Sequence, residues 1–97
     1  MDLLCIDDTY PDEYLTWAFK NGVKHPIKDK MYSLRGWKKH ATGETGLYLN
    51  EINNPKVSDP LLGEYLMEPS FHQRRFVTLD MKPFVADEII KITEDVR

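Results

Sequence analysis

The sequence contains one cysteine and no long apolar run. Cys5 has no second cysteine for an internal disulfide, and it lies in the apolar run Leu3-Leu4-Cys5-Ile6. A thiol in such a run, without a basic neighbour, is expected to be buried and unreactive, as in a reducing compartment. No segment approaches the ~20 apolar residues that span a bilayer, and the first residues lack the positive region of a signal peptide. The sequence therefore predicts a cytoplasmic protein.

Motifs of catalysis are also missing. The chain has no nucleophile elbow, phosphate-binding loop, dinucleotide fingerprint or Cys/His metal pattern. His25, His40 and His72 have no carboxylate or cysteine at ligand spacing, so we expect ordinary surface histidines. The acids within residues 7–13 offer oxygen ligands, but their spacing matches no calcium loop and suits the start of a helix. We therefore expect no enzyme activity, no cofactor and no metal.

The 97 residues form one domain, 1–97, with a single core. Aromatic residues make up 11% of the chain and supply that core with large side chains. The net charge of −3 gives no global reason to expect nucleic acid.

Apolar periodicity predicts an α+β fold. A strand is expected at 3–6, and Tyr14, Leu15, Ala18 and Phe19 recur at helical spacing within a helix at 10–21, which Thr9 caps. Alternating patterns predict a hairpin of strands 31–37 and 47–52 around a turn at 40–46. A short strand at 63–67, a helical turn at 71–74 capped by Ser70 and a strand at 76–79 are expected to follow. Apolar residues at helical spacing predict a second helix at 84–96.

The predicted core unites both helices with the sheet. Phe71 and Phe76 are expected to anchor the two halves of the segment 68–79 in that core. The full set is Leu4, Ile6, Leu15, Tyr32, Leu34, Leu47, Leu49, Leu66, Phe71, Phe76, Val77, Ile89 and Ile92.

The order of these elements resembles the SH3-like small β-barrel. In that fold a 3₁₀ turn precedes the last strand, and Pro69-Ser70-Phe71 with Phe76-Val77 looks like a lengthened form of the motif at that turn. The resemblance implies a strongly bent antiparallel sheet of about five strands over 1–79, with the helix at 10–21 inserted and the helix at 84–96 appended. The features of a proline-peptide groove are not recognisable, so the resemblance carries the fold and not that function.

A looser resemblance links the chain to short phage and prophage open reading frames. Cys5-Ile6-Asp7, residues 30–34 and Arg75-Phe76 match, in order, a pattern that such frames contain. The resemblance implies a phage or mobile-element protein.

Charge is segregated along the chain. Residues 2–19 carry five acids and no Lys or Arg, whereas residues 20–40 carry seven Lys or Arg against one Asp. Tyr32 and Trp37 are interleaved with the basic residues, and such a surface can track phosphates and stack bases. The alternative is a lysine-rich connection that neighbouring acids neutralise.

Arg74 and Arg75 form the sharpest local basic feature. They could grip a phosphate or a partner carboxylate, or one of them could pair with Glu64 or Glu68. The residues expected to contact a partner are Lys30, Arg35, Trp37, Lys38, Lys39, Arg74 and Arg75.

The leading functional hypothesis is a non-enzymatic protein-binding or inhibitor protein that acts on a host or phage protein, with a host defence system as the target and self-association through the second helix. The alternative is a nucleic-acid-binding module that uses residues 20–40. A small hydrolase or ligand-binding protein would need a deep cleft lined by His72 and the N-terminal acids.

Overall fold

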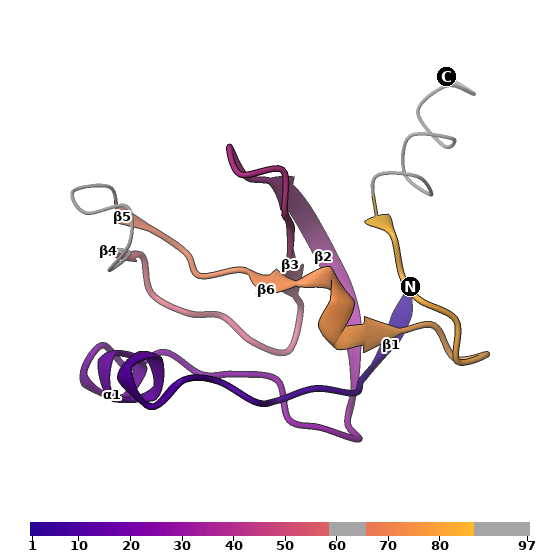
Figure 1. Cartoon of the computed structure of the whole chain (residues 1–97), viewed down its shortest axis with the longest axis horizontal. Coiled ribbons are helices and arrows are strands. Elements are labelled where there is room, and N and C mark those ends of the chain that lie inside the picture. The colour runs from indigo at the N-terminus through magenta and orange to yellow at the C-terminus, as the bar shows by residue number, and fades with distance from the viewer. Residues whose placement is uncertain (59–65, 87–97) are drawn as a thin grey trace.

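The computed structural model describes residues 1–58 and 66–86 (Figure 1). It is an α+β domain with a five-stranded antiparallel sheet, as the sequence predicted. The sheet has the order β6-β3-β2-β1-β7, and its strands are β1 (Asp2–Cys5), β2 (Met31–Lys39), β3 (Thr45–Leu49), β6 (Phe71–His72) and β7 (Phe76–Val77).

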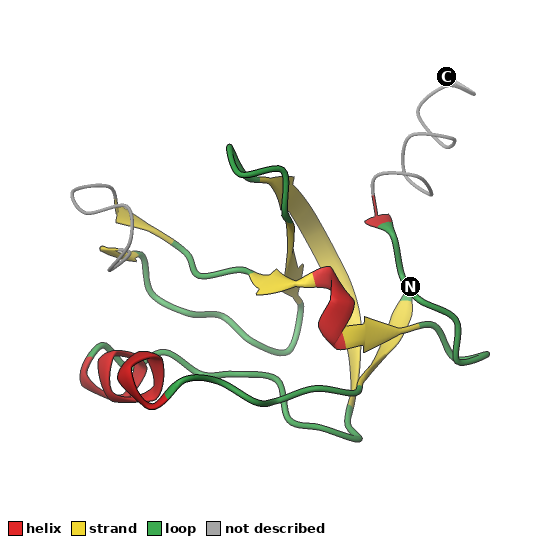
Figure 2. Cartoon of the chain, viewed as in Figure 1, coloured by secondary structure: helices red, strands yellow, loops and turns green. Residues whose placement is uncertain are grey.

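Four further elements of the described residues lie outside this sheet. The helix α1 (Asp12–Lys20) is connected to the sheet by long loops, which are green in Figure 2. The strands β4 (Val57–Ser58) and β5 (Leu66–Met67) form a separate two-stranded sheet, and the 3₁₀ turn η1 (Gln73–Arg75) joins β6 to β7. In the described residues the edge strands β6 and β7 do not pair with each other, so the sheet is open there.

The strand β2 connects the two halves of the sheet. Its first residues pair with β1, and its later residues pair with β3. The register shifts at Arg35, between the pairs Leu34↔Leu49 and Gly36↔Tyr48, which marks a β-bulge. Because a bulge inserts one residue into the period of two, Trp37 rather than Gly36 follows Leu34 onto the core face.

The core lies against the inner face of this sheet. Tyr32, Leu47, Leu49, Phe71, Phe76 and Val77 are buried as predicted, and Leu34 packs against them while half-exposed. Leu3, Ile52, Phe84 and Ala86 are buried as well, although the prediction omitted them. Cys5 is buried, which confirms that it is an internal thiol, and burial raises its pKa.

Two predicted core positions on β1 and just after it were out of phase. Leu3 and Cys5 are fully buried, whereas Leu4 is half-buried and Ile6 is exposed. Successive side chains of a strand point to opposite faces, so a run of four apolar residues can bury only every second one. Cys5 pairs with the buried Phe76 of β7, and this register places the side chains of Leu3 and Cys5 on the core face.

The prediction of Leu15 as a core residue was also wrong. The helix buries Ala18 and half-buries Tyr14 and Trp17, which leaves Leu15 40% and Phe19 90% exposed. Leu15 and Phe19 are four residues apart and therefore share a face, which is turned to solvent.

The local caps differ from the expected ones. Pro11 is the residue before α1 and no side chain of the described residues caps the helix, while Thr9 donates its N–H to the Asp7 carboxylate. The 3₁₀ turn begins after His72, whose Nδ1 accepts the N–H of Arg74, so the predicted cap at Ser70 was wrong. The predicted stop of the helix is confirmed, because Gly22 has a φ of +68°.

Some predicted features fall outside the described residues. These are most of the strand at 63–67, the helix at 84–96 beyond residue 86, and the core side chains of Leu66, Ile89 and Ile92.

One glycine permits the close approach of β3 to the segment before β6. Gly46 pairs with His72, and a Cβ on Gly46 would lie 2.6 Å from Ser70 Cβ and 2.9 Å from His40 Nε2. Contacts this short require the Ser70 backbone to move, because Cβ is fixed to the main chain. The side chains of His40 and Ser70 therefore meet only because residue 46 has no side chain.

We expect Gly46→Ala to lower the free energy of unfolding by about 1–3 kcal/mol, since the added methyl overpacks this contact. Gly36→Ala is the control, because its Cβ would meet only Tyr48 Cδ2 at 4.0 Å. Urea denaturation of both variants measures the difference. Equal stabilities would show that Ser70 relaxes without cost.

Candidate functional site

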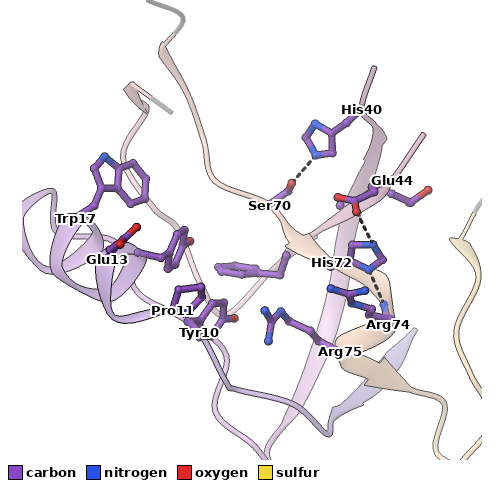
Figure 3. A pocket seen from close by; sticks show the side chains of 14 residues that line it. Tyr10, Pro11, Glu13, Trp17, His40, Glu44, Ser70, His72, Arg74 and Arg75 are labelled. Carbon is purple, nitrogen blue, oxygen red and sulfur yellow. Dashed lines mark hydrogen bonds and ion pairs between the residues drawn. The ribbon is translucent and has the colours of Figure 1, made fainter. Parts of the chain in front are cut away.

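A groove of about 530 Å³ lies between α1 and the segment β6–η1 (Figure 3). We call it the α1–β6 groove. Its lining residues come from three parts of the chain that are far apart in sequence: Tyr10, Pro11, Glu13, Tyr14, Trp17, His40, Glu44, Thr45, Gly46, Ser70, Phe71, His72, Arg74 and Arg75.

A second hollow of about 300 Å³ extends the groove toward β4 and β5. It shares five lining residues with the first, namely Tyr14, Trp17, His40, Glu44 and Ser70. It adds Val57, Met67 and Pro69, among others. Together the two hollows follow the segment 67–75 from β5 to η1, so the whole groove is elongated.

Aromatic rings form one wall of the groove. The Tyr10 and Tyr14 rings are stacked with centroids 5.2 Å apart, and the Trp17 centroid lies 5.4 Å from that of Tyr14. The His25 ring packs behind them, 4.6 Å from Tyr10 and 5.3 Å from Tyr14, and meets the edge of Phe71. Aromatic side chains have only two side-chain torsions each and these rings also contact one another, so the wall is apolar and costs little entropy to order.

Arg75 holds this wall in place. Its Nη1 donates to the carbonyl oxygens of Thr9 at 2.9 Å and Asp7 at 3.3 Å, and lies 3.3 Å from Asp7 Oδ1. Its guanidinium carbon lies 4.0 Å from the centroid of Tyr10, in a cation–π contact. Only 14% of the side chain is exposed. Arg75 therefore fixes residues 7–10 against η1, and with them the start of the aromatic wall.

The neighbouring Arg74 has the opposite environment. It is exposed at the groove, and its guanidinium has no ion pair or hydrogen bond with any residue that the structure describes. Neither arginine pairs with Glu68 within those residues, because Glu68 pairs with Arg35 instead. Arg74 is thus a positive charge at the groove that a ligand can reach.

Two histidines line the groove opposite the aromatic wall. His40 Nε2 lies 3.0 Å from Ser70 Oγ, and His72 Nε2 lies 3.9 Å from Glu44 Oε1. Burial, followed by the nearby Arg74 charge, lowers the pKa of His72. A triad needs a third group that orients the histidine, and within the described residues His40 has no side-chain partner besides Ser70. No such third group is present beside the pair in residues 1–58 and 66–86.

Metal binding has no support in the described residues. No three His, Cys, Asp or Glu side chains there lie close enough to hold one ion. Of the N-terminal acids only Glu13 lines the groove. The Asp7 and Asp8 carboxylates accept backbone N–H groups of Thr9 and Lys28, so they order the loops around α1.

The remaining predicted contact residues do not gather at this site. Lys30 precedes β2, while Lys38 and Lys39 end it, which separates them by about 30 Å of strand. Arg35 pairs with Glu68 and stacks on Tyr48 at 5.3 Å. Trp37 packs against the core. Only Arg74 and Arg75 of the seven line the groove.

Sequence reasoning missed the residues that form the aromatic wall. Tyr10, Tyr14 and Trp17 were assigned to an ordinary core-facing helix. Tyr14 and Trp17 are three residues apart and share one side of α1, which was the available signal, whereas Tyr10 precedes the helix and reaches the same wall from the loop. Leu15 and Phe19 form a second apolar side of the same helix, so the pattern did not show which side faces the protein.

Comparison with protein-family models, curated proteins and solved structures finds no match to this chain. Within the described residues no helix has the length and apolar character needed to cross a membrane.

We expect Arg75→Ala to lower the free energy of unfolding by about 2–4 kcal/mol, because it removes a buried charge-assisted network and the ring contact. Arg74→Ala removes the same charge one residue earlier, from an exposed side chain, and should change stability by less than about 0.5 kcal/mol. Urea denaturation of the Arg75→Ala and Arg74→Ala variants measures the difference in stability. Equal losses would contradict the different roles of the two arginines.

The pH dependence of stability should report on His25. Burial lowers its pKa, and its Nδ1 is buried without a partner in the described residues. As pH falls below about 6.5, the unfolded chain takes up the proton before the folded chain does, so stability is lost in mild acid. His25→Phe keeps the ring contacts, and we expect it to lose less Tm than the parent between pH 7.5 and 5.5.

Other titrating groups are separated from this effect. The pKa values of Asp7, Glu51 and Asp80 are lowered, so these groups change the stability only below about pH 4.5, outside the range from pH 7.5 to 5.5. The contribution of His72 remains in both proteins and cancels in the comparison. Thermal melts with the same slope against pH for parent and variant would show that His25 stays accessible to protons.

Proposed function

We propose that this chain is a non-enzymatic protein-binding module and that its contact surface is the α1–β6 groove. The observation that carries the proposal is the rigid aromatic wall, which Arg75 fixes and which an open groove leaves accessible. Tyr, Trp and Arg are enriched among the few residues that contribute most of the binding energy at protein interfaces. Here all three stand at one groove, so a partner can bury them together without a large ordering cost.

The architectural part of this proposal is an SH3-like relationship. Its support is the five-stranded antiparallel sheet and the 3₁₀ turn η1, which precedes β7. We propose that the chain is a divergent SH3-like domain with α1 inserted between the first two strands. Binding of proline-rich peptides is not part of the proposal.

The biological setting that we propose is a phage or other mobile element. Its support is the likeness of Cys5-Ile6-Asp7 and Arg75-Phe76 to short phage reading frames. A small binding protein of that origin acts by occupying a surface of another protein. Inhibition of a host defence protein in the cytoplasm is the role that fits this class.

Nucleic-acid binding is the less favoured alternative. The basic residues 20–40 are spread along α1, a loop and β2, and Arg35 is neutralised by Glu68. Trp37 is partly buried against the core, which leaves less of its ring accessible for stacking on bases. Lys38 and Lys39 remain as an exposed pair at one end of β2.

The proposal predicts that partner capture depends on one side of α1. Immobilised parent protein and the variant Phe19→Ser should retain the same protein from a host lysate, whereas Trp17→Ala should lose most of it. Phe19 is the matched control, because it lies on the same helix but is turned away from the groove and is 90% exposed. Quantitative mass spectrometry of the retained proteins measures the difference.

Two results would contradict this assignment. Loss of capture with Phe19→Ser alone would move the contact to the outer side of α1. Retention of nucleic acid that falls steeply with salt, and falls again in a Lys38→Ala, Lys39→Ala double variant, would favour the alternative.

A further inference from the structure

We propose that the α1–β6 groove binds an extended peptide segment, which adds as a strand along the residues 68–72 and places an acidic side chain at Arg74 and an apolar one near Trp17. This inference rests on the proposed function and specifies the partner's form: a short acidic and apolar strand rather than a folded surface.

An unpaired backbone edge lies along the groove. Among the strands that the structure describes, β6 is the outermost of its sheet and pairs on one side only, with β3. Between β5 and β6, the main chain of residues 68–70 makes no hydrogen bond to any described residue. Backbone N–H and C=O groups need partners, and an arriving strand supplies them in register.

The dimensions of the groove suit one extended segment. The two hollows run along residues 67–75, with Met67 and Pro69 at one end and Arg74 at the other. A strand rises about 3.3 Å per residue, so roughly six residues cover Pro69 to Arg74. The opposite wall of Tyr14 and Trp17 would pack on side chains that project away from the edge.

Charge and polarity set the direction of the ligand. At the η1 end the exposed Arg74 guanidinium has no counter-ion among the described residues, so it favours a carboxylate. At the other end Val57, Met67 and Trp17 line the hollow and favour a large apolar side chain. The two preferences are at opposite ends, so they fix both the composition and the orientation of the peptide.

The experiment uses the full chain and a random library of displayed dodecapeptides. Selection should enrich peptides in which Asp or Glu recurs at one position and a large apolar residue recurs about four positions away. A selected peptide is then synthesised with blocked ends in three forms: unchanged, with the acid replaced by its amide, and with alternate backbone nitrogens methylated. Its binding is read from Trp17 fluorescence in a Trp37→Phe background, because only these two tryptophans are present.

Three changes are expected to weaken the binding of the peptide. The amide form should bind about tenfold or more weakly, and Arg74→Ala should weaken the unchanged peptide by a similar factor while leaving the amide form unaffected. Methylation should abolish binding, because it removes the main-chain donors that a strand uses. A peptide with the same composition in scrambled order is the control.

The inference is overturned if selection enriches no acidic position, if basic or proline-rich peptides emerge, or if binding survives both methylation and Arg74→Ala. It is also overturned if β6 proves to pair with a second copy of the chain, which sedimentation would reveal as a dimer that excludes peptide. If capture still depends on Trp17 in any of these cases, the protein-binding function stands and only the strand-like ligand is refuted.

Discussion

The contact between Arg75 and residues 7–10 connects the sheet to the segment that leads into α1. The backbone carbonyl of Arg75 accepts the N–H of Ile6 and so extends the pairing of β1 with β7. Its side chain binds the Asp7 and Thr9 carbonyls and covers the Tyr10 ring. One residue thereby joins the last strand, the first strand and the approach to α1. The aromatic wall is rigid because Arg75 binds the backbone carbonyls just before Tyr10 and also packs on the face of the Tyr10 ring.

The two adjacent arginines differ because of the turn that carries them. A 3₁₀ turn has three residues per turn, so neighbouring side chains diverge by about 120°. Arg75 therefore reaches inward to the N-terminal loop, while Arg74 emerges at the groove. The cap of this turn is His72, which also lines the groove. The geometry of the turn therefore gives Arg75 a structural role and leaves the Arg74 charge accessible.

Sequence patterns were informative where one face of an element is apolar and the other is not. They located the hairpin, Tyr32, Leu47 and Leu49, since apolar residues recur there at a period of two. They failed at 3–6, because four consecutive apolar residues do not show which two side chains face the core. The pairing of Cys5 with Phe76 places Leu3 and Cys5 there. They failed again at Trp17 and Trp37, because helix rotation and the bulge at Arg35 depend on tertiary contacts that no local pattern contains.

An open sheet edge beside an apolar groove carries a risk of uncontrolled association, and this chain restricts that edge at both ends. Pro69 has no N–H to donate and interrupts the strand before β6. The turn η1 ends β6 after two residues and removes its backbone from the plane of the sheet. Continuous pairing with many copies needs a longer, flatter edge. A short segment that also satisfies Arg74 and the aromatic wall fits what remains, so the same restrictions that limit aggregation would select for a specific ligand.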